Sequence, residues 1–117
     1  MNEEQLKKRT KEFAKNIIHL CRNLPNNREG RLIGDQMFRS GTSVAANYRA
    51  ACRGRSKAEF VSKLAIVEEE ADETMFWLEV IKEMGIYKEP VVEDLIKESD
   101  EIVAIIVSSI RTVKKKA

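Results

Sequence analysis

The sequence of 117 residues predicts an all-α protein, an antiparallel up-down-up-down four-helix bundle. Four segments repeat apolar residues at helical spacing, and Pro or Gly stands at the breaks between them. The chain has only five Gly and two Pro, which favours long helices joined by few turns. Short connections make neighbouring helices antiparallel, so we expect residues 1–117 to form one four-helix domain.

The first helix is expected from about Glu3 to Asn23. Pro25 ends it, because proline lacks an amide N–H and disfavours helical backbone at the preceding residue. The apolar stripe of this helix comprises Leu6, Phe13, Ile17, Leu20, Cys21 and Leu24.

The second helix is expected from about Arg28 to Cys52, before the break at Gly54. Its inward-facing residues are Ile33, Met37, Ser40, Val44, Tyr48 and Ala51. The run RSGTSVAANY, from Arg39 to Tyr48, places small and polar residues where a bundle helix usually has Leu or Ile. Such residues form either a functional site or the packing pattern of the fold.

The third helix is expected to begin after Ser56, an N-cap residue with Glu59 completing a capping-box pattern, and to stop at Gly85. Its inward set is Phe60, Leu64, Val67, Ala71, Met75 and Leu78. The fourth helix is expected to begin near Pro90 and to end in lysines, which suit the negative end of a helix dipole. Its inward set is Leu95, Ile102, Ile106, Ile110 and Val113.

The polar run in the second helix predicts a specific contact. Arg39, Ser43, Ala46 and Ala50 share one narrow stripe, with Asn47 beside it, and small residues allow two helices to approach closely. In an antiparallel hairpin centred on Gly54, Arg39 lies about 15 residues back and Glu70 about 15 forward. We therefore predict an Arg39–Glu70 ion pair where the second and third helices meet.

Glu70 and Glu73 fall within an apolar arc of the third helix, where a carboxylate needs a partner. We expect Gln36 near Glu73, and Asn47 near Ser62 or Lys63. A buried ion pair contributes little net stability, so its expected benefit is helix register. The resulting structural signature comprises Arg39, Ser40, Ser43, Asn47, Glu70, Glu73 and Trp77.

The third helix carries more apolar surface than one bundle core can bury. Its apolar arc includes Trp77 and covers more than half of the helical wheel, and the fourth helix adds Ile96, Val103 and Val107. A surplus apolar face on a small domain is typical of a partner surface. We expect the protein to associate with copies of itself.

Charge is divided unevenly along the chain. Residues 1–63 hold 14 Lys or Arg and 6 Asp or Glu, a net charge of +8, whereas residues 64–117 hold 7 and 13, a net charge of −6. This division indicates either a surface facing nucleic acid or the pairing of basic helices with acidic ones.

The sequence also argues against several classes of protein. No apolar run approaches the roughly 20 residues of a membrane span, and the first residues lack the apolar core of a signal peptide. We expect a cytoplasmic protein without a membrane partner. Cys21 and Cys52 form no CxxC pattern and have no nearby His at ligand spacing, so no metal site and no cofactor is expected.

Residues 38–81 closely resemble the four-helix-bundle proteins encoded within intervening sequences of 23S ribosomal RNA genes. The resemblance is carried by Arg-Ser-x-x-Ser-x-x-Ala-Asn-Tyr from Arg39 to Tyr48, and continues through Phe60, Lys63, Leu64 and the run from Trp77 to Glu79. It implies a bundle that assembles as a homopentamer. It also implies a relation to the accessory variability protein of diversity-generating retroelements, a basic pentamer that binds nucleic acid and a reverse transcriptase. No catalytic activity is established for the family, so the resemblance implies no catalytic residues.

Nucleic-acid binding without catalysis is the leading hypothesis, with RNA or DNA as the partner. Its candidate contacts are Arg49, Arg53, Arg55 and Lys57 at the tip between the second and third helices. Five copies would turn this modest patch into a basic ring. Aromatic residues are not interleaved with these cations, so we expect salt-sensitive phosphate contacts rather than base stacking.

Two alternatives belong to other classes. The first is a scaffold or adaptor that uses the surplus apolar face and has no nucleic-acid role. The second is a Mg²⁺-dependent nucleotide pyrophosphatase, because Glu-rich helices can hold Mg²⁺ between carboxylates. The acidic residues that would form its site are Glu69, Glu70, Glu73, Asp94, Glu98 and Glu101. Only the last hypothesis involves a small-molecule substrate.

Overall fold

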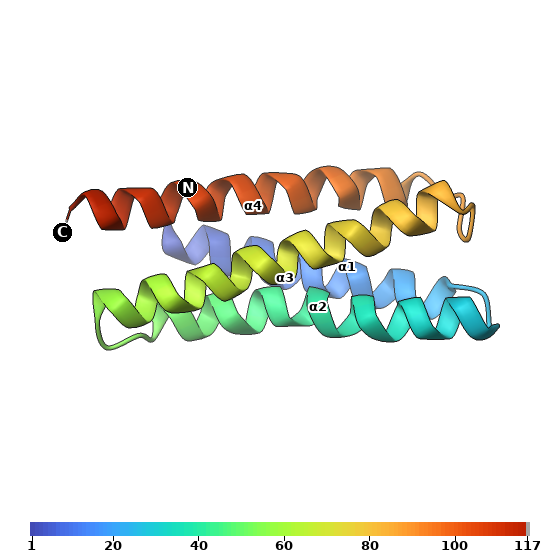
Figure 1. The fold of residues 1–117 in the computed structure, drawn as a ribbon, viewed down its shortest axis with the longest axis horizontal. Coiled ribbons are helices and arrows are strands. Elements are labelled where there is room, and N and C mark those ends of the chain that lie inside the picture. The colour runs from blue at the N-terminus through green and yellow to red at the C-terminus, as the bar shows by residue number, and fades with distance from the viewer. Residues whose placement is uncertain (117) are drawn as a thin grey trace.

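The computed structural model describes residues 1–116 and contains four long helices within them (Figure 1). They are α1 (Glu3–Asn23), α2 (Arg28–Cys52), α3 (Lys57–Glu83) and α4 (Val91–Lys115). Successive helices run antiparallel, which gives an up-down-up-down bundle measuring 48 × 20 × 19 Å. The predicted fold class is confirmed, and the helix bounds fall within two residues of those expected.

Asparagine caps the first two helices. The side chain of Asn2 accepts a hydrogen bond from the Gln5 amide at 2.8 Å, and the Gln5 side chain accepts one from the Asn2 amide at 2.9 Å. Asn27 accepts from the Gly30 amide at 2.9 Å at the start of α2. These bonds satisfy amides that have no partner within the helix.

The predicted cap of α3 is present in a modified form. Ser56 accepts a hydrogen bond from the Glu59 amide at 3.1 Å, as expected. The Glu59 carboxylate reaches back to the amide of Arg55 at 2.7 Å, one residue before the N-cap. The amides of Glu59 and Arg55 are therefore both bonded, although in a standard capping box the second bond would go to the amide of Ser56.

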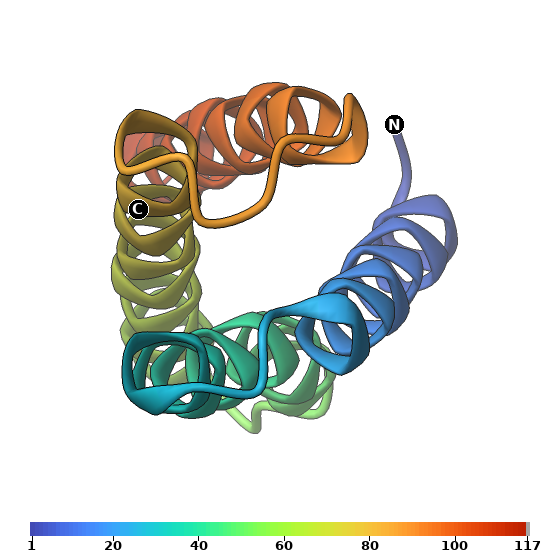
Figure 2. The ribbon, with the colours of Figure 1, turned by 90° about the vertical axis from the view of Figure 1, so that its right-hand side faces the viewer.

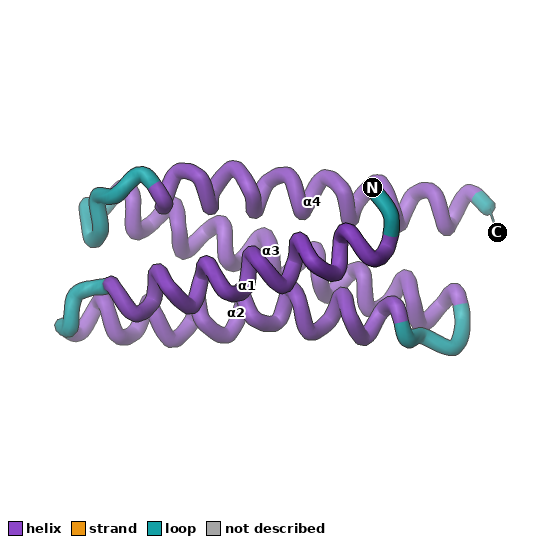
Figure 3. The backbone as a smooth tube through the Cα atoms, turned by 180° about the vertical axis from the view of Figure 1, so that it is seen from behind, coloured by secondary structure: helices purple, strands orange, loops and turns teal. Residues whose placement is uncertain are grey.

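Gly85 ends α3 in a left-handed conformation with φ of +62°. The amide of Ile86 then donates to the carbonyl of Ile81 at 2.9 Å, which completes a Schellman motif. The teal loops of Figure 3 show that this turn and the α1–α2 turn lie at one end of the bundle, with the α2–α3 turn at the other. Pro90 occupies the N-cap position of α4, one residue before the first turn in which it was expected.

The helices lie at four corners in chain order, as the end-on view shows (Figure 2). The α1–α2, α2–α3 and α3–α4 pairs pack extensively, whereas α1 and α4 make few contacts. Arg9 of α1 bridges this looser side, because its guanidinium donates to both Glu98 oxygens at 2.7 and 2.6 Å and to Glu101 at 3.2 Å. One arginine thus ties the first helix to the last.

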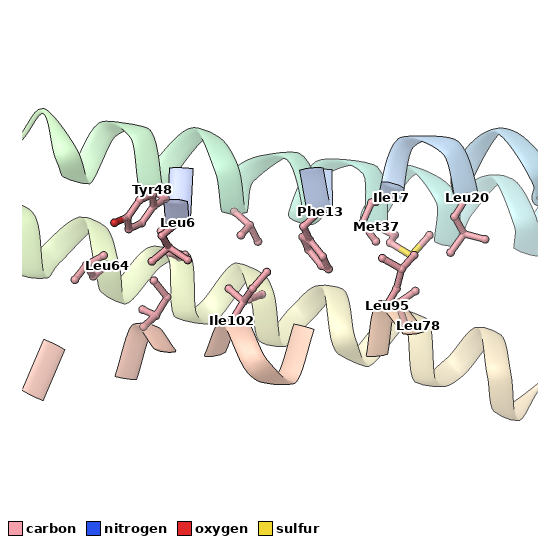
Figure 4. Packing of buried hydrophobic residues seen from close by; sticks show 14 of the residues in the cluster. Leu6, Phe13, Ile17, Leu20, Met37, Tyr48, Leu64, Leu78, Leu95 and Ile102 are labelled. Atoms are coloured by element: carbon pink, nitrogen blue, oxygen red, sulfur yellow. The ribbon is translucent and has the colours of Figure 1, made fainter. Parts of the chain in front are cut away.

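The core runs along the bundle axis, and Figure 4 shows Leu6, Phe13, Met37, Tyr48 and Ile102 packed between the helices. Most residues expected to face inward are buried or packed against this core. Ile110 and Val113 are only half-buried, because the end of α4 extends beyond the start of α1 (Figure 1). Four buried Ser and Thr residues join the apolar core, one from each described helix: Thr10, Ser40, Thr74 and Ser99.

Candidate nucleic-acid interface

Arg39 holds two carboxylates across the α2–α3 seam. Its Nη1 donates to Glu70 at 2.7 Å, as the sequence predicted, and its Nη2 donates to Glu73 at 2.6 Å. Trp77 Nε1 donates to the same Glu73 oxygen at 3.2 Å. The side chain of Arg39 is 52% exposed and that of Glu70 is 14% exposed. The arginine therefore covers the seam from outside, and the ion pair is not buried, although we expected a buried pair.

The pKa of Glu73 reflects competing influences. Burial raises the pKa of this carboxyl, while the hydrogen bonds from Arg39 and Trp77 lower it. The effects that lower the pKa together exceed the effect of burial, so the pKa of Glu73 lies below its usual range. The hydrogen bond to Glu73, and after it the one to Glu70, raises the pKa of the Arg39 guanidinium.

Two further contacts expected at this seam are replaced by others. Asn47 donates to the Ser43 carbonyl at 3.0 Å and to Ser43 Oγ at 2.8 Å on its own helix, where we expected contacts with Ser62 or Lys63. The side-chain amide of a helical residue can reach the residue four positions earlier on the same helix, so Asn47 can bond to Ser43 without crossing to α3. The partners of Glu73 are Arg39 and Trp77, where we expected Gln36.

One small residue of α2 permits close approach to α1. A Cβ atom placed on Gly41 would lie 2.8 Å from Ile17 Cγ2 of α1, so the glycine permits close approach of these two helices. Ala46 is exposed and lines a hollow between α1 and α2, although the predicted stripe placed it at the α3 seam. Gly41 is not a member of the predicted stripe, so its close approach to α1 was not predicted, and the expected place of Ala46 at the α3 seam was wrong.

The hollow between α1 and α2 has a volume of about 440 Å³. We call it the basic hollow, and its lining residues are Lys7, Lys8, Lys11, Ala45, Ala46, Arg49 and Arg53. Two of the four predicted nucleic-acid contacts, Arg49 and Arg53, therefore lie beside lysines of α1. Arg55 and Lys57 are exposed near the start of α3, outside this lining.

The three lysines were absent from the sequence-based prediction of the site. They lie far from Arg49 in the chain, and only the packing of α1 against α2 brings them together. The available signal was the spacing of Lys7, Lys8 and Lys11, which puts three cations on adjacent positions of one helical turn.

Most of the positive charge in the basic hollow is not neutralised. Lys7 forms an ion pair with Glu4 at 3.1 Å. Among residues 1–116, no other carboxylate lies within 4.0 Å of a cationic group of the hollow. Arg9 and Arg39, by contrast, each hold two glutamates. Four of the five cations that line the hollow between α1 and α2 therefore have no ion-pair partner among the described residues.

A larger hollow of about 660 Å³ lies between α1 and α4. Its walls carry both signs of charge, including Lys8, Arg9, Glu12, Asp94 and Glu98, and Arg9 and Glu98 neutralise each other. It therefore offers no comparable attraction to an anion or a cation.

Four of the six carboxylates proposed for a pyrophosphatase site are engaged by arginines. Arg39 binds Glu70 and Glu73, and Arg9 binds Glu98 and Glu101. An arginine beside each pair takes the place that Mg²⁺ would need. Within residues 1–116, no three His, Cys, Asp or Glu side chains are grouped so that they could hold a metal ion. None of the four described helices has the length and apolar character to cross a membrane.

Comparisons with known proteins agree on the fold. The sequence profile of the family described as 23S rRNA-intervening sequence protein matches residues 2–108. The chain is also similar to a crystal structure of a protein with unknown function from the S23 ribosomal protein family of Bacteroides thetaiotaomicron. The two share 34% sequence identity and a TM-score of 0.87, over 95% of this chain and 99% of the other. No curated protein matches the sequence.

Proposed function

Because this chain belongs to the 23S rRNA-intervening sequence protein family, we propose that it is a cytoplasmic, non-enzymatic, self-associating protein that binds RNA or DNA. The observation that carries the proposal is the basic hollow, where Lys8, Lys11, Arg49 and Arg53 present charge that no described carboxylate offsets. Arg55 and Lys57, exposed near the same end of α2, extend this basic surface.

The chemistry of the surface supports contacts to phosphate. Lysine offers a compact charge, and the arginine guanidinium offers a planar fork that matches two phosphate oxygens. No aromatic residue lines the basic hollow, so it provides no platform on which bases could stack. Binding should therefore depend on the nucleic-acid backbone and on salt rather than on sequence.

Salt-dependent binding tests this proposal. We expect Arg49→Glu with Arg53→Glu to weaken binding of a short labelled RNA or DNA and to reduce the slope of log affinity against log salt by about two. A second pair, Arg55→Glu with Lys57→Glu, measures the contribution of the helix tip. The charge-matched control is Lys88→Glu with Lys97→Glu, two exposed lysines outside the hollow. Binding that is insensitive to salt, or equally weakened by the control, would overturn the proposal.

The exposed apolar residues support self-association and leave the scaffold as a second candidate function. Leu32, Phe76 and Met84 are 55%, 52% and 69% exposed. The rings of Phe76 and Trp77 meet edge to face with centroids 4.9 Å apart. Exposed aromatic, Met and Leu side chains are typical of protein interfaces. The family resemblance implies that a homopentamer forms.

A further inference from the structure

The five cations of the basic hollow are confined to a short length of the bundle. Lys7, Lys8 and Lys11 lie within one turn of α1, and Arg49 and Arg53 are separated by one turn of α2. One turn advances about 5.4 Å along a helix, so the five cations, of which only Lys7 is paired with a carboxylate, are attached to about 6 Å of each helix axis.

The space between these cations is concave because its floor is made of alanine. The side chains of Ala45 and Ala46 end at Cβ, while the surrounding lysines and arginines are long. The resulting volume of about 440 Å³ lies within the range of small-molecule sites. A group that enters the hollow can therefore be approached by cations from both helices.

The density of positive charge in the hollow exceeds the density of negative charge along a nucleic-acid backbone. A single strand has about one phosphate per 3.4 Å, so about two phosphates face a 6 Å segment. A triphosphate concentrates about three to four negative charges on three linked groups over a similar length. The hollow is thus better matched in charge to a compact oligophosphate than to a passing strand.

We propose that the basic hollow binds a compact oligophosphate, and that its source is the 5′-triphosphate end of an RNA chain. This assignment rests on the proposed function, since it identifies the part of the nucleic acid that occupies the hollow. A free nucleoside triphosphate carries the same chemistry and is the competing source. Arg49 and Arg53 supply paired donors to phosphate oxygens, and the lysines of α1 supply point charges.

The experiment compares one RNA sequence that ends in a 5′-triphosphate, a 5′-monophosphate or a 5′-hydroxyl. Inorganic tripolyphosphate and ATP serve as free competitors. Ala46→Leu fills the hollow while retaining all five cations, and Ala104→Leu makes the same change at an exposed position of α4. Circular dichroism and thermal unfolding verify that both variants fold.

We expect the triphosphate RNA to bind about tenfold more tightly than the hydroxyl RNA, as a few additional charge-assisted contacts imply. Ala46→Leu should remove this preference, and Ala104→Leu should preserve it. ATP and tripolyphosphate should compete equally, because no aromatic residue lines the hollow to hold a base.

The other outcomes separate the two proposals. RNA binding that ignores the 5′ end, or a preference that survives Ala46→Leu, overturns the oligophosphate site and leaves nucleic-acid binding in place. Binding of tripolyphosphate without binding of any RNA supports the site with a free source and overturns the proposed function. Failure of every ligand to bind overturns both.

Discussion

The hydroxyl groups of Ser40 and Thr74 lie 2.8 Å apart at the α2–α3 seam, and both side chains are fully buried. Each hydroxyl also has a carbonyl acceptor on its own helix, Glu70 at 2.7 Å for Thr74 and Met37 at 3.3 Å for Ser40, so either can supply the hydrogen of the shared bond. This contact explains one polar residue of the RSGTSVAANY run as a satisfied part of the core. It joins the helices at the same level as the Arg39 ion pairs.

The first prediction concerns the stability of this hydroxyl pair. Ser40→Ala and Thr74→Val should each lower the free energy of unfolding by about 1 kcal/mol, because each removes one hydrogen-bond partner inside the core. The double variant should lose less free energy of unfolding than the two single variants lose in sum, since neither hydroxyl is left without its partner. Urea unfolding at one protein concentration measures the cycle. Strict additivity would show that the two hydroxyls do not stabilise each other.

The second prediction concerns the Arg39 contacts and pH. The pKa of Glu73 is lowered in the folded protein, so its ionised form stabilises the fold above the ordinary value of 4.5. This contribution is lost as the pH falls below 4.5 through the folded pKa. Arg39→Gln should therefore lower the free energy of unfolding by about 0.5 to 1 kcal/mol near neutral pH and by less in acid.

Salt and a conservative variant complete this test. Because Arg39 is 52% exposed, added salt should also narrow the difference between the native protein and Arg39→Gln. Arg39→Lys should recover only part of the loss, since an ammonium group cannot donate in two fixed directions as the guanidinium does. A difference that is constant from neutral to acidic pH would contradict an electrostatic role.

The helices and their junctions could be predicted from the sequence because local rules determine them. Pro25, Gly54 and Gly85 end segments whose apolar periodicity is clear, and Ser56 caps as its type predicts. The Arg39–Glu70 contact also followed, because an antiparallel hairpin fixes register by counting from its turn. Each of these inferences needed only residues close in the chain or joined by one short loop.

The composition of the basic hollow could not be obtained in this way. Arg49 and Arg53 were selected for their proximity to a turn, yet the structure groups them with lysines at the start of α1. That grouping depends on the offset between α1 and α2, which close contact between Gly41 and Ile17 helps to set. Whether a side chain such as that of Asn47 bonds to its own helix or to a neighbouring helix likewise depends on tertiary packing.

The third prediction tests the close contact of α1 with α2. Alanine in place of Gly41 gains about 1 kcal/mol of helix propensity but brings Cβ to 2.8 Å from the fully buried Ile17. Overpacking typically costs about 1 to 3 kcal/mol, so a net loss of stability is expected. Gly34→Ala is the control in the same helix, because its Cβ would meet Leu24 at an ordinary 3.4 Å. If both variants were equally stable, Gly41 would not be required for packing.

The fourth prediction addresses self-association through the outer face of α3. Phe76 and Met84 are half or more exposed and lie about two turns apart along the helix, so burying them against another copy would stabilise an oligomer. The native protein should sediment as a species several times larger than its 13.4 kDa chain. Phe76→Glu with Met84→Glu should shift it toward the monomer, because the interface would then have to desolvate two charges.

Trp77 provides an independent readout of the same equilibrium. It is the one tryptophan of the chain and its ring contacts Phe76, so its emission should shift to the blue as protein concentration rises. Ser62→Glu and Ala104→Glu are exposed changes of equal charge outside the Phe76–Met84 segment, and together they should leave both measurements unchanged. A native protein that remains monomeric at micromolar concentration would rule out self-association. An oligomer that withstands the paired glutamates at Phe76 and Met84 would place the interface on another face of the bundle.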